Sequence, residues 1–223
     1  MSWRQRVAAW YGQQVLPLGL DWVCGWGRFG AQRAQVVPEA RGRILEIGIG
    51  TGLNLAHYDA SQVDSITGVD PATELHPLAH RRAQEAGLRV DLVPLQAESL
   101  PFDAECFDTV VVTYSLCTIE DPIAALQEMR RVLKPQGRLI YCEHGLAPEA
   151  AVQRWQRRIG PMWCRIAGGC QLDRNIPDLI RAAGFELISP QAGYIPGPRP
   201  FTYNYWGQAR TLAAVPSSAP CAG

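Results

Sequence analysis

Residues 43–52 read Arg-Ile-Leu-Glu-Ile-Gly-Ile-Gly-Thr-Gly, and this stretch decides the fold. The aliphatic run at residues 44–47 is typical of a buried strand in a parallel sheet. Three glycines follow at every second position, and glycine tolerates positive φ and lets a ligand approach the backbone closely. We expect residues 53–58 to form a helix after the glycines. The glycines would then lie between a strand and a helix N-terminus, where open α/β sheets bind nucleotides.

The acidic residues around this loop favour one kind of nucleoside. The next predicted strand, residues 65–69, ends at Asp70, whose carboxylate can accept hydrogen bonds from both hydroxyls of a ribose. Glu46 precedes the loop, where it would repel a pyrophosphate and suit a cationic ligand. A sulfonium with an α-ammonium group is such a ligand, so we predict S-adenosylmethionine. The spacing also differs from the dinucleotide pattern G-x-G-x-x-G, because the third glycine comes one residue early.

The loop and the acid together resemble motif I and the following acidic residue of the class I methyltransferases. This resemblance implies an α/β fold with a three-layer, seven-stranded, Rossmann-like sheet, which we expect to span residues 41–209. It also implies a set of cofactor-binding residues. These are Glu46, Gly48, Gly50, Thr51, Gly52, Asp70 and Pro71.

A later segment resembles the part of the family that holds the adenine ring. Gln96 stands where an acid is usual, and its amide oxygen could accept the same hydrogen bond. Ala97 would act through its backbone N–H, and Glu98 is a candidate helper whose simpler role is that of a neighbour to a helix N-cap. Tyr114 emerges from the carboxyl end of a β-branched strand, at the edge that lines the ligand crevice.

Composition favours a small-molecule enzyme. The chain has 223 residues, enough for one domain with a good core, and carries 21 basic and 21 acidic side chains. This balance gives no electrostatic footprint for nucleic acid, so we expect a small methyl acceptor and no nucleic-acid partner.

Cysteine usage and hydropathy predict a cytoplasmic location. The seven cysteines include no C-x-x-C pair, and we interpret them as reduced thiols. We find no secretory signal and no apolar run long enough to span a membrane. His76 and His80 are four residues apart, but Pro77 lies between them and no acidic partner is obvious, so we predict a solvated helix face and no metal site.

The first 40 residues are rich in aromatic side chains at helical spacing. We interpret residues 1–40 as an aromatic helical segment, with a second short helix near residues 22–29. It could pack against the sheet, or it could form a lid that brings Tyr11 over the cofactor. A weak peripheral membrane contact is a third alternative, although few basic residues flank the segment.

Further along the chain, strand and helix patterns alternate as a seven-stranded sheet requires. A helical insertion with Trp155, Ile159 and Trp163 on one face follows the fifth strand, and residues 210–223 are expected to be a flexible tail. The remaining predicted strands are residues 89–93, 107–113, 139–142, 186–188 and 202–206. The remaining predicted helices are residues 74–86, 176–183 and the segment after Asp121-Pro122.

A narrower resemblance concerns the acceptor. The combination Leu116-Cys117-Thr118, Glu143-His144, Gly169-Cys170 and Arg174 is similar to the small thiol methyltransferases of the methyltransferase-like family. His144, at a strand exit, is our candidate for the catalytic base, and Cys117 and Trp163 are candidates for contact with the acceptor. Arg174 could stabilise a thiolate or bind a carboxylate of the acceptor. The plainer alternatives are a structural histidine for His144, a small buried hydrophobe for Cys117 and a surface ion pair for Arg174.

The chemistry of methyl transfer fits these residues. A thiolate attacks the methyl carbon best in a pocket that excludes water. Because a free thiol has a pKa near 8.5, one nearby base is needed at neutral pH. We therefore predict S-methylation of a small apolar thiol. The open alternatives are C-, O- or N-methylation of a quinol or a phospholipid amine, and a non-catalytic module that binds S-adenosylmethionine.

Overall fold

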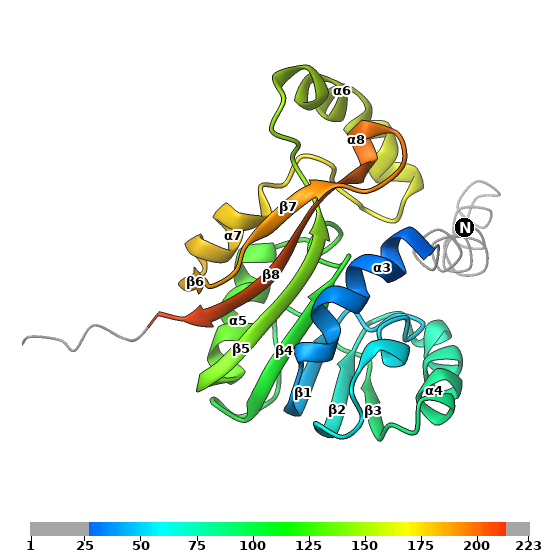
Figure 1. The fold of residues 1–223 in the computed structure, drawn as a ribbon, viewed down its shortest axis with the longest axis vertical. Helices are drawn as coiled ribbons and strands as arrows, with labels where there is room; N and C mark the ends of the chain where they lie inside the picture. The colour runs from blue at the N-terminus through cyan, green and yellow to red at the C-terminus, as the bar shows by residue number, and fades with distance from the viewer. Residues whose placement is uncertain (1–26, 213–223) are drawn as a thin grey trace, which may run out of the picture.

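The computed structural model describes residues 27–212 of the chain. Tyr11, most of the tryptophan-rich segment and the tail from residue 213 onward lie outside the described residues. Figure 1 shows a twisted sheet with helices before and behind it, and two further helices beyond one end of the strands.

Within residues 27–212 the strands form one eight-stranded sheet with the order β3-β2-β1-β4-β5-β8-β6, and β7 pairs with β8. The five strands from β1 to β5 are parallel, whereas β8 runs antiparallel to β5, β6 and β7. The bounds of the strands are β1 Gly42–Ile47, β2 Val63–Val69, β3 Val90–Val93, β4 Phe107–Thr113, β5 Leu133–His144, β6 Phe185–Leu187, β7 Gln191–Tyr194 and β8 Tyr203–Thr211.

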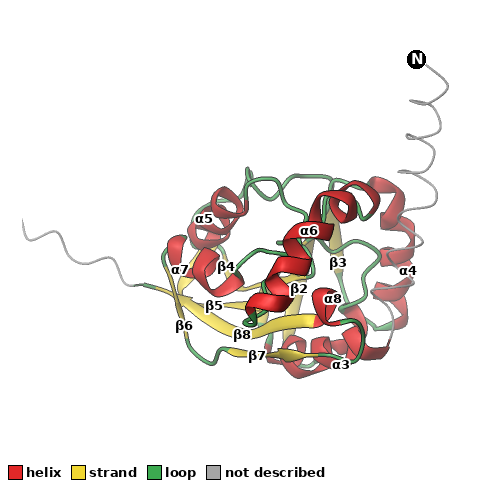
Figure 2. Ribbon diagram, turned by 90° about the horizontal axis from the view of Figure 1, so that it is seen from above, coloured by secondary structure: helices red, strands yellow, loops and turns green. Residues whose placement is uncertain are grey.

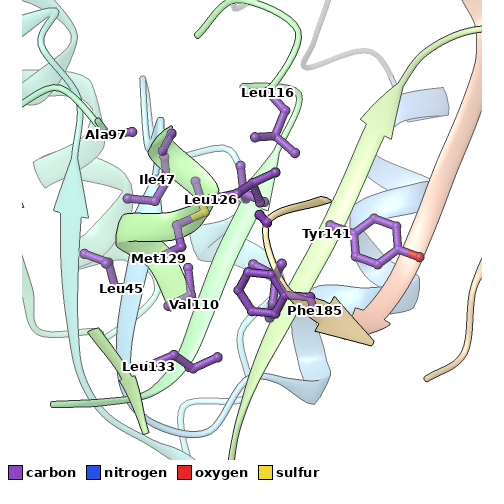
Figure 3. Packing of buried hydrophobic residues seen from close by; sticks show 14 of the residues in the cluster. Leu45, Ile47, Ala97, Val110, Leu116, Leu126, Met129, Leu133, Tyr141 and Phe185 are labelled. Carbon is purple, nitrogen blue, oxygen red and sulfur yellow. The ribbon is translucent and has the colours of Figure 1, made fainter. Parts of the chain in front are cut away.

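Helices cover both faces of the sheet, which makes three layers (Figure 2). Alternate residues of one strand face opposite layers: Ile44 packs with the cluster that includes α3 and α4, and Leu45 packs with the cluster that includes α5 and α7. Figure 3 shows the second cluster, in which Met129 of α5 lies against Val110 of β4. The helix bounds are α3 Gly27–Val36, α4 His76–Glu85, α5 Pro122–Val132, α6 Ala150–Ile166, α7 Ile176–Ala182 and α8 Arg199–Thr202.

The predicted α/β class is confirmed, and the strand count is eight where seven were predicted. The additional strand is β7, which pairs with the first half of β8 in a hairpin. Its residues include a glycine and an alanine, so they carry little of the β-branched signal by which strands are recognised. The last strand extends to Thr211, two residues beyond the predicted boundary of the domain.

The prediction of a helix at residues 53–58 is wrong. Only a 3-10 helix, Leu55–His57, forms there. Asn54 and Tyr58 are held by side-chain hydrogen bonds to the buried Glu46. Hydrogen bonds to Glu46, which lies in β1, therefore hold these residues in a turn in place of the expected helix.

The sheet places a ligand crevice where the strand order reverses. β1 pairs with β2 on one side and with β4 on the other, so the loops that follow β1 and β4 diverge at their carboxyl ends. The helical insertion is confirmed, because α6 lies beyond the carboxyl end of β5, together with α8 (Figure 1). Residues of both helices, Trp163 of α6 and Phe201 of α8, form part of the crevice wall.

Candidate active site

A cavity of about 660 Å³ opens at the carboxyl ends of the parallel strands. Its size lies in the range typical of small-molecule sites. Its wall includes thirteen of the sixteen predicted site residues; Gly52 and Arg174 lie elsewhere, and Tyr11 is outside the described residues. The thirteen are Glu46, Gly48, Gly50, Thr51, Asp70, Pro71, Gln96, Ala97, Glu98, Tyr114, Cys117, His144 and Trp163.

The glycine loop takes a backbone path that other residues would resist. Gly48, Gly50 and Gly52 have φ values of 67°, 53° and 81°. A Cβ on Gly48 would lie 2.1 Å from Oγ of Ser115, whereas one on Gly50 would meet nothing closer than 3.8 Å. A Cβ at Gly50 would make only ordinary van der Waals contacts, and Gly50 lines the cavity, where a ligand can approach its backbone.

Gly52 serves packing. A Cβ there would lie 2.6 Å from Leu55 and 3.1 Å from the backbone of Ala79. Gly52 therefore lets α4 approach the loop and does not itself line the cavity. Arg82 of α4 then donates two hydrogen bonds to Thr51, one to its carbonyl oxygen at 3.0 Å and one to Oγ1 at 2.6 Å.

Asp70 joins the end of β2 to the glycine loop. Its Oδ2 accepts a hydrogen bond from the backbone N–H of Gly50 at 2.9 Å, and its Oδ1 accepts one from Ala72 at 2.9 Å. Burial is the largest influence on this carboxyl and raises its pKa, despite the two backbone donors. Each oxygen retains acceptor capacity on the cavity side, because a carboxylate oxygen can accept two hydrogen bonds.

Glu46 is a buried carboxylate in the cavity wall, only 1% exposed. Oε1 accepts a hydrogen bond from Asn54 Nδ2 at 3.0 Å, and Oε2 accepts one from the hydroxyl of Tyr58 at 2.7 Å. Burial raises the pKa of Glu46 to about 7, against the lowering effect of these two donors. A cation bound beside this carboxylate would therefore relieve an unfavourable desolvation.

The segment predicted to hold adenine lies on the cavity wall after β3. Ala97 is buried, and Gln96 and Glu98 line the cavity beside it. Oε1 of Glu98 accepts a weak hydrogen bond from the backbone N–H of Asp121 at 3.3 Å. Asp121 is the N-cap of α5, as predicted, so Glu98 also takes the simpler role of neighbour to a helix N-cap.

Two residues of α3, which the sequence did not indicate as site residues, form part of the cavity wall. The ring of Phe29 contacts Tyr114 edge-on at 5.1 Å between centroids, and the guanidinium of Arg33 lies 4.7 Å from the centre of the same ring. Tyr114 itself has a positive φ of 52°, unusual for a residue with a bulky side chain. The aromatic signal near residue 29 was visible, but nothing in the pattern connected it to Tyr114.

The buried carboxylate of Glu143 fixes the loop that follows β4. Oε1 of Glu143 accepts hydrogen bonds from the backbone N–H groups of Ser115 at 2.8 Å and Leu116 at 3.0 Å. Burial raises the pKa of Glu143 to about 7. Arg174 donates to the carbonyl oxygen of Leu116. The structure thus directs Arg174 to the backbone of this loop and not to the cavity, where the sequence predicted contact with the acceptor.

Three side chains with sulfur or imidazole donor atoms meet at the cavity wall. They are Cys117 after β4, His144 at the end of β5 and Cys170 after α6. Nε2 of His144 lies 3.0 Å from Sγ of Cys170, and Nε1 of Trp163 donates to the same sulfur at 3.2 Å. The hydrogen bond from Cys117, followed by those from His144 and Trp163, holds the pKa of Cys170 well below its usual range. The sequence had not indicated Cys170 as a site residue of its own.

The same contact affects the imidazole. Burial by itself would lower the pKa of His144, but the hydrogen bond and the charge of Cys170 outweigh it and raise that pKa. The two side chains therefore favour each other's charged forms, and a proton can be shared between them. Trp163 and Phe201, whose ring centroids lie 4.6 Å apart, give this end of the cavity an apolar wall.

Comparison with known proteins decides the family. A family model described as a methyltransferase domain matches residues 45–141. A demethylmenaquinone methyltransferase of Thermus thermophilus is 32% identical, over 76% of this chain and 78% of that protein. The chain belongs to the class I S-adenosylmethionine-dependent methyltransferases. The methyltransferase uses S-adenosylmethionine, and the cavity at the switch point of its sheet fits that cofactor in size and in its acidic groups.

Of two further relatives of the methyltransferase, one has a name that states its acceptor. A mitochondrial methyltransferase of Saccharomyces cerevisiae is 30% identical over 74% of this chain and 39% of its own. A thiol S-methyltransferase of Rattus norvegicus is 34% identical over 65% of this chain and 60% of its own. The chain thus spans less than two thirds of the length of these two relatives.

Solved structures share the fold. The N-methyltransferase NodS of Bradyrhizobium japonicum, in complex with S-adenosylhomocysteine, has a TM-score of 0.67 and 16% identity over 93% of this chain and 98% of that one. The [4+2]-cyclase SpnF has a TM-score of 0.63 and 25% identity over 84% of this chain and 81% of that one. In the part of the methyltransferase that the structure describes, no helix is both long and apolar enough to cross a bilayer.

Proposed function

We propose that this methyltransferase transfers a methyl group from S-adenosylmethionine to the sulfur of a small, apolar thiol. The observation that carries the proposal is the cluster of Cys117, His144 and Cys170 on the cavity wall. A thiol becomes a strong nucleophile only when its proton is removed, and this cluster lines the same cavity as the acidic groups of the cofactor loop.

The cofactor would be held by the glycine-loop side of the cavity. Asp70 would accept hydrogen bonds from the ribose hydroxyls, and the buried carboxylate of Glu46 would attract the ammonium group. Ala97 and Gln96 would contact the adenine ring, and Pro71 would pack beside it. The methyl carbon on the sulfonium is electrophilic, which is the chemistry that the bound cofactor supplies.

The chain's own residues would prepare the acceptor. Trp163 and Phe201 would exclude water and favour an apolar acceptor. The exclusion of water would strengthen the electrostatic interactions of a thiolate. The proton of the thiol would be taken up by the His144 and Cys170 pair, because the two side chains already share a hydrogen bond. Glu143 would act as a positioning residue, since it fixes the loop that carries Cys117.

The relatives support a methyl acceptor of low molecular weight but differ in the atom methylated. The thiol S-methyltransferase of Rattus norvegicus supports sulfur, whereas a phosphatidylethanolamine N-methyltransferase of Cereibacter sphaeroides, 35% identical over 51% of this chain, supports nitrogen. A fold alone does not determine the reaction, as the similarity to a cyclase illustrates. The proposal therefore rests on the cluster.

An acceptor panel tests the proposal. Purified protein is incubated with S-adenosylmethionine and an alkyl thiol, an aromatic thiol, a demethylated quinol or phosphatidylethanolamine vesicles, and the methylated product is identified by mass spectrometry. We expect methyl thioethers from the thiols, and no product from the Asp70→Ala variant at low cofactor concentration. Turnover of the quinol or the lipid amine without turnover of any thiol would refute the thiol proposal. Absence of all product, with cofactor bound, would indicate a non-catalytic module.

We also propose that the segment around Trp10 and Tyr11, which precedes α3, covers the cavity as a lid, whereas Val37 and Ala40 are buried against the sheet. Phe29 and Arg33 of α3 support this, because both contact Tyr114 on the cavity wall. Deletion of residues 1–26 should weaken cofactor binding if the lid extends to Tyr11, and an unchanged affinity would refute it. The cytoplasmic location remains a prediction, since one relative is mitochondrial.

A further inference from the structure

The side chains of Cys117, His144 and Cys170 bring three possible metal-donor atoms close together on the cavity wall. One sulfur or nitrogen atom from each of Cys117, His144 and Cys170 can be chosen so that all lie within 4.8 Å of one another. They come from three separate segments: the loop after β4, the end of β5 and the loop after α6. Cys117 and Cys170 are 3% and 9% exposed, so these thiols are shielded from bulk solvent.

This donor set is typical of one class of ligand. Two cysteine sulfurs and one histidine nitrogen form three-protein-ligand zinc sites that keep a fourth position open. Bond lengths of about 2.3 Å to sulfur and about 2.0 Å to nitrogen place the tetrahedral ligand atoms of such a site roughly 3.5 to 3.8 Å apart. The present separations require only small side-chain movements to reach these values.

The surroundings of the cluster also match a metal site. Nε1 of Trp163 donates to Sγ of Cys170 at 3.2 Å, and such outer donors hold a thiolate ligand in place. Glu143 precedes His144 in β5 and fixes the loop that leads to Cys117. Each of the two cysteines therefore has an additional contact that positions it.

We propose that Cys117, His144 and Cys170 bind one Zn²⁺ ion whose fourth position faces the cavity and takes the sulfur of the methyl acceptor. The metal site itself stands on the geometry of the three side chains. Its catalytic use rests on the proposed thiol methylation. All three residues line the same cavity as Glu46 and Asp70, so an acceptor bound there shares one enclosed space with the cofactor.

The step balances without any further reagent. The acceptor thiol forms a zinc–sulfur bond, and its S–H proton leaves to solvent. When zinc is bound, the metal therefore replaces the His144 and Cys170 pair in promoting deprotonation of the thiol. A sulfur lone pair then forms the bond to the methyl carbon, and the bond from that carbon to the sulfonium breaks with its electron pair on the departing sulfur. The neutral thioether is a weak ligand and dissociates. Metal coordination keeps a thiol deprotonated, so it supplies the nucleophile at neutral pH.

Metal binding is tested on the full-length, reduced protein after removal of metals by a chelator. Titration with Zn²⁺ against a chromophoric chelator should give one tightly bound ion per chain. Co²⁺ should give the sulfur-to-metal charge-transfer bands and the intense visible bands of a tetrahedral site. Cys170→Ser and Cys117→Ser should each weaken Zn²⁺ binding and reduce the charge-transfer intensity by about half. Trp163→Phe removes an outer donor and should cost roughly 10–100-fold in affinity.

Two controls separate this site from other thiols and from misfolding. Cys106→Ser removes a half-buried thiol outside the cavity and should leave one bound ion and full activity. A variant with Cys24 and Cys221 changed to serine should also retain it. Equal cofactor affinity in the Cys170→Ser variant and the wild type shows that the variant is folded.

The outcomes distinguish the metal site from the proposed function. No bound Zn²⁺, or binding that Cys117→Ser, Cys170→Ser and His144→Ala leave unchanged, would overturn the site. Undiminished thiol methylation by chelated, metal-free protein would overturn its catalytic use while the thiol function stands. Zinc bound at the cluster without turnover of any thiol would support the site and refute the proposed acceptor.

Discussion

The Nε2 atom of His144 lies 3.0 Å from the Sγ atom of Cys170, although 26 residues separate them in the chain. His144 ends β5, and Cys170 follows α6, so the helical insertion must fold back over the strand end for the two to meet. The insertion therefore forms part of the cavity wall, and Trp163 belongs to it as well. This contact links the chemistry at the end of the sheet to a segment outside the sheet.

We predict that His144→Ala slows methylation of an alkyl thiol by roughly 10²–10⁴-fold near neutral pH. The deficit should shrink as the pH rises past the pKa of the acceptor thiol, because the free thiolate then forms without assistance. The measurement is the pH–rate profile of the variant beside that of the wild type. His80→Ala, an exposed change on α4, is the matched control. Equal rates at neutral pH would remove His144 from the mechanism.

Asp70→Ala should weaken the binding of S-adenosylmethionine more than tenfold. The change removes acceptors for the ribose and also the support of the Gly50 N–H, and hydrogen bonds to charged groups are worth about 1.5–3 kcal/mol each. Calorimetric titration measures the affinity. Asp70→Asn retains one acceptor oxygen and should be intermediate. An unchanged affinity in Asp70→Ala would contradict the assignment of this residue to the cofactor.

Cofactor affinity should rise by about fivefold between pH 6 and pH 7. Burial raises the pKa of Glu46 to about 7 in the ligand-free protein, and a cation favours the ionised carboxylate. Protonated Glu46 must therefore lose its proton on binding, which costs affinity below that pKa. Titrations at several pH values measure the trend, and Glu46→Gln should flatten it. A pH-independent affinity in the wild type would show that Glu46 does not interact with the cationic group.

The burial of Glu46 should also affect the pH dependence of the protein's stability. Its folded pKa lies above the unfolded value of 4.5, so its contribution to stability is greatest at low pH and is lost as the pH rises through about 7. We expect the thermal midpoint of ligand-free Glu46→Gln at pH 8 to be no lower than that of the wild type. Its weaker cofactor binding would then reflect lost recognition. A large drop in the midpoint would instead show that the bonds from Asn54 and Tyr58 require a carboxylate.

Alanine at two glycines of one loop should have different effects on stability. Both positions have positive φ, which costs about 1–2 kcal/mol for a residue with a Cβ. At Gly48 the new Cβ would also collide with Ser115, which adds roughly 1–3 kcal/mol of overpacking. Denaturant unfolding should show Gly48→Ala as clearly less stable than Gly50→Ala. Equal losses would mean that Ser115 can move aside.

Glu143→Ala should lower both stability and activity, and Glu143→Gln should restore most of each. Alanine leaves the buried N–H groups of Ser115 and Leu116 without their acceptor, at about 1–3 kcal/mol apiece. Glutamine keeps a carbonyl oxygen in place. The ratio kcat/KM of the two variants, together with their unfolding free energies, separates positioning from proton transfer. A Gln variant as inactive as Ala would show that the carboxylate charge is required.

Much of the fold could be predicted because it follows from local patterns. The β-branched run of β4 and the apolar strand of β1 indicate buried parallel strands, and alternation places their side chains on two faces. Segments without such a pattern were missed or misread. β7 carries little strand signal, and residues 53–58 form a turn because Glu46, in another element, binds two of their side chains.

The sequence by itself predicted which residues meet in the glycine-loop part of the cavity wall. Gly48, Gly50, Glu46 and Asp70 lie in two short segments, so spacing along the chain was sufficient. Only the tertiary structure brought the metal-ligand candidates together. Cys117, His144 and Cys170 come from three distant segments, and their donor atoms meet because β4 and β5 are neighbours and α6 returns over their ends. The tertiary structure also decided the position of Arg174. Its guanidinium donates to the buried carbonyl oxygen of Leu116, and no local sequence pattern predicts this contact.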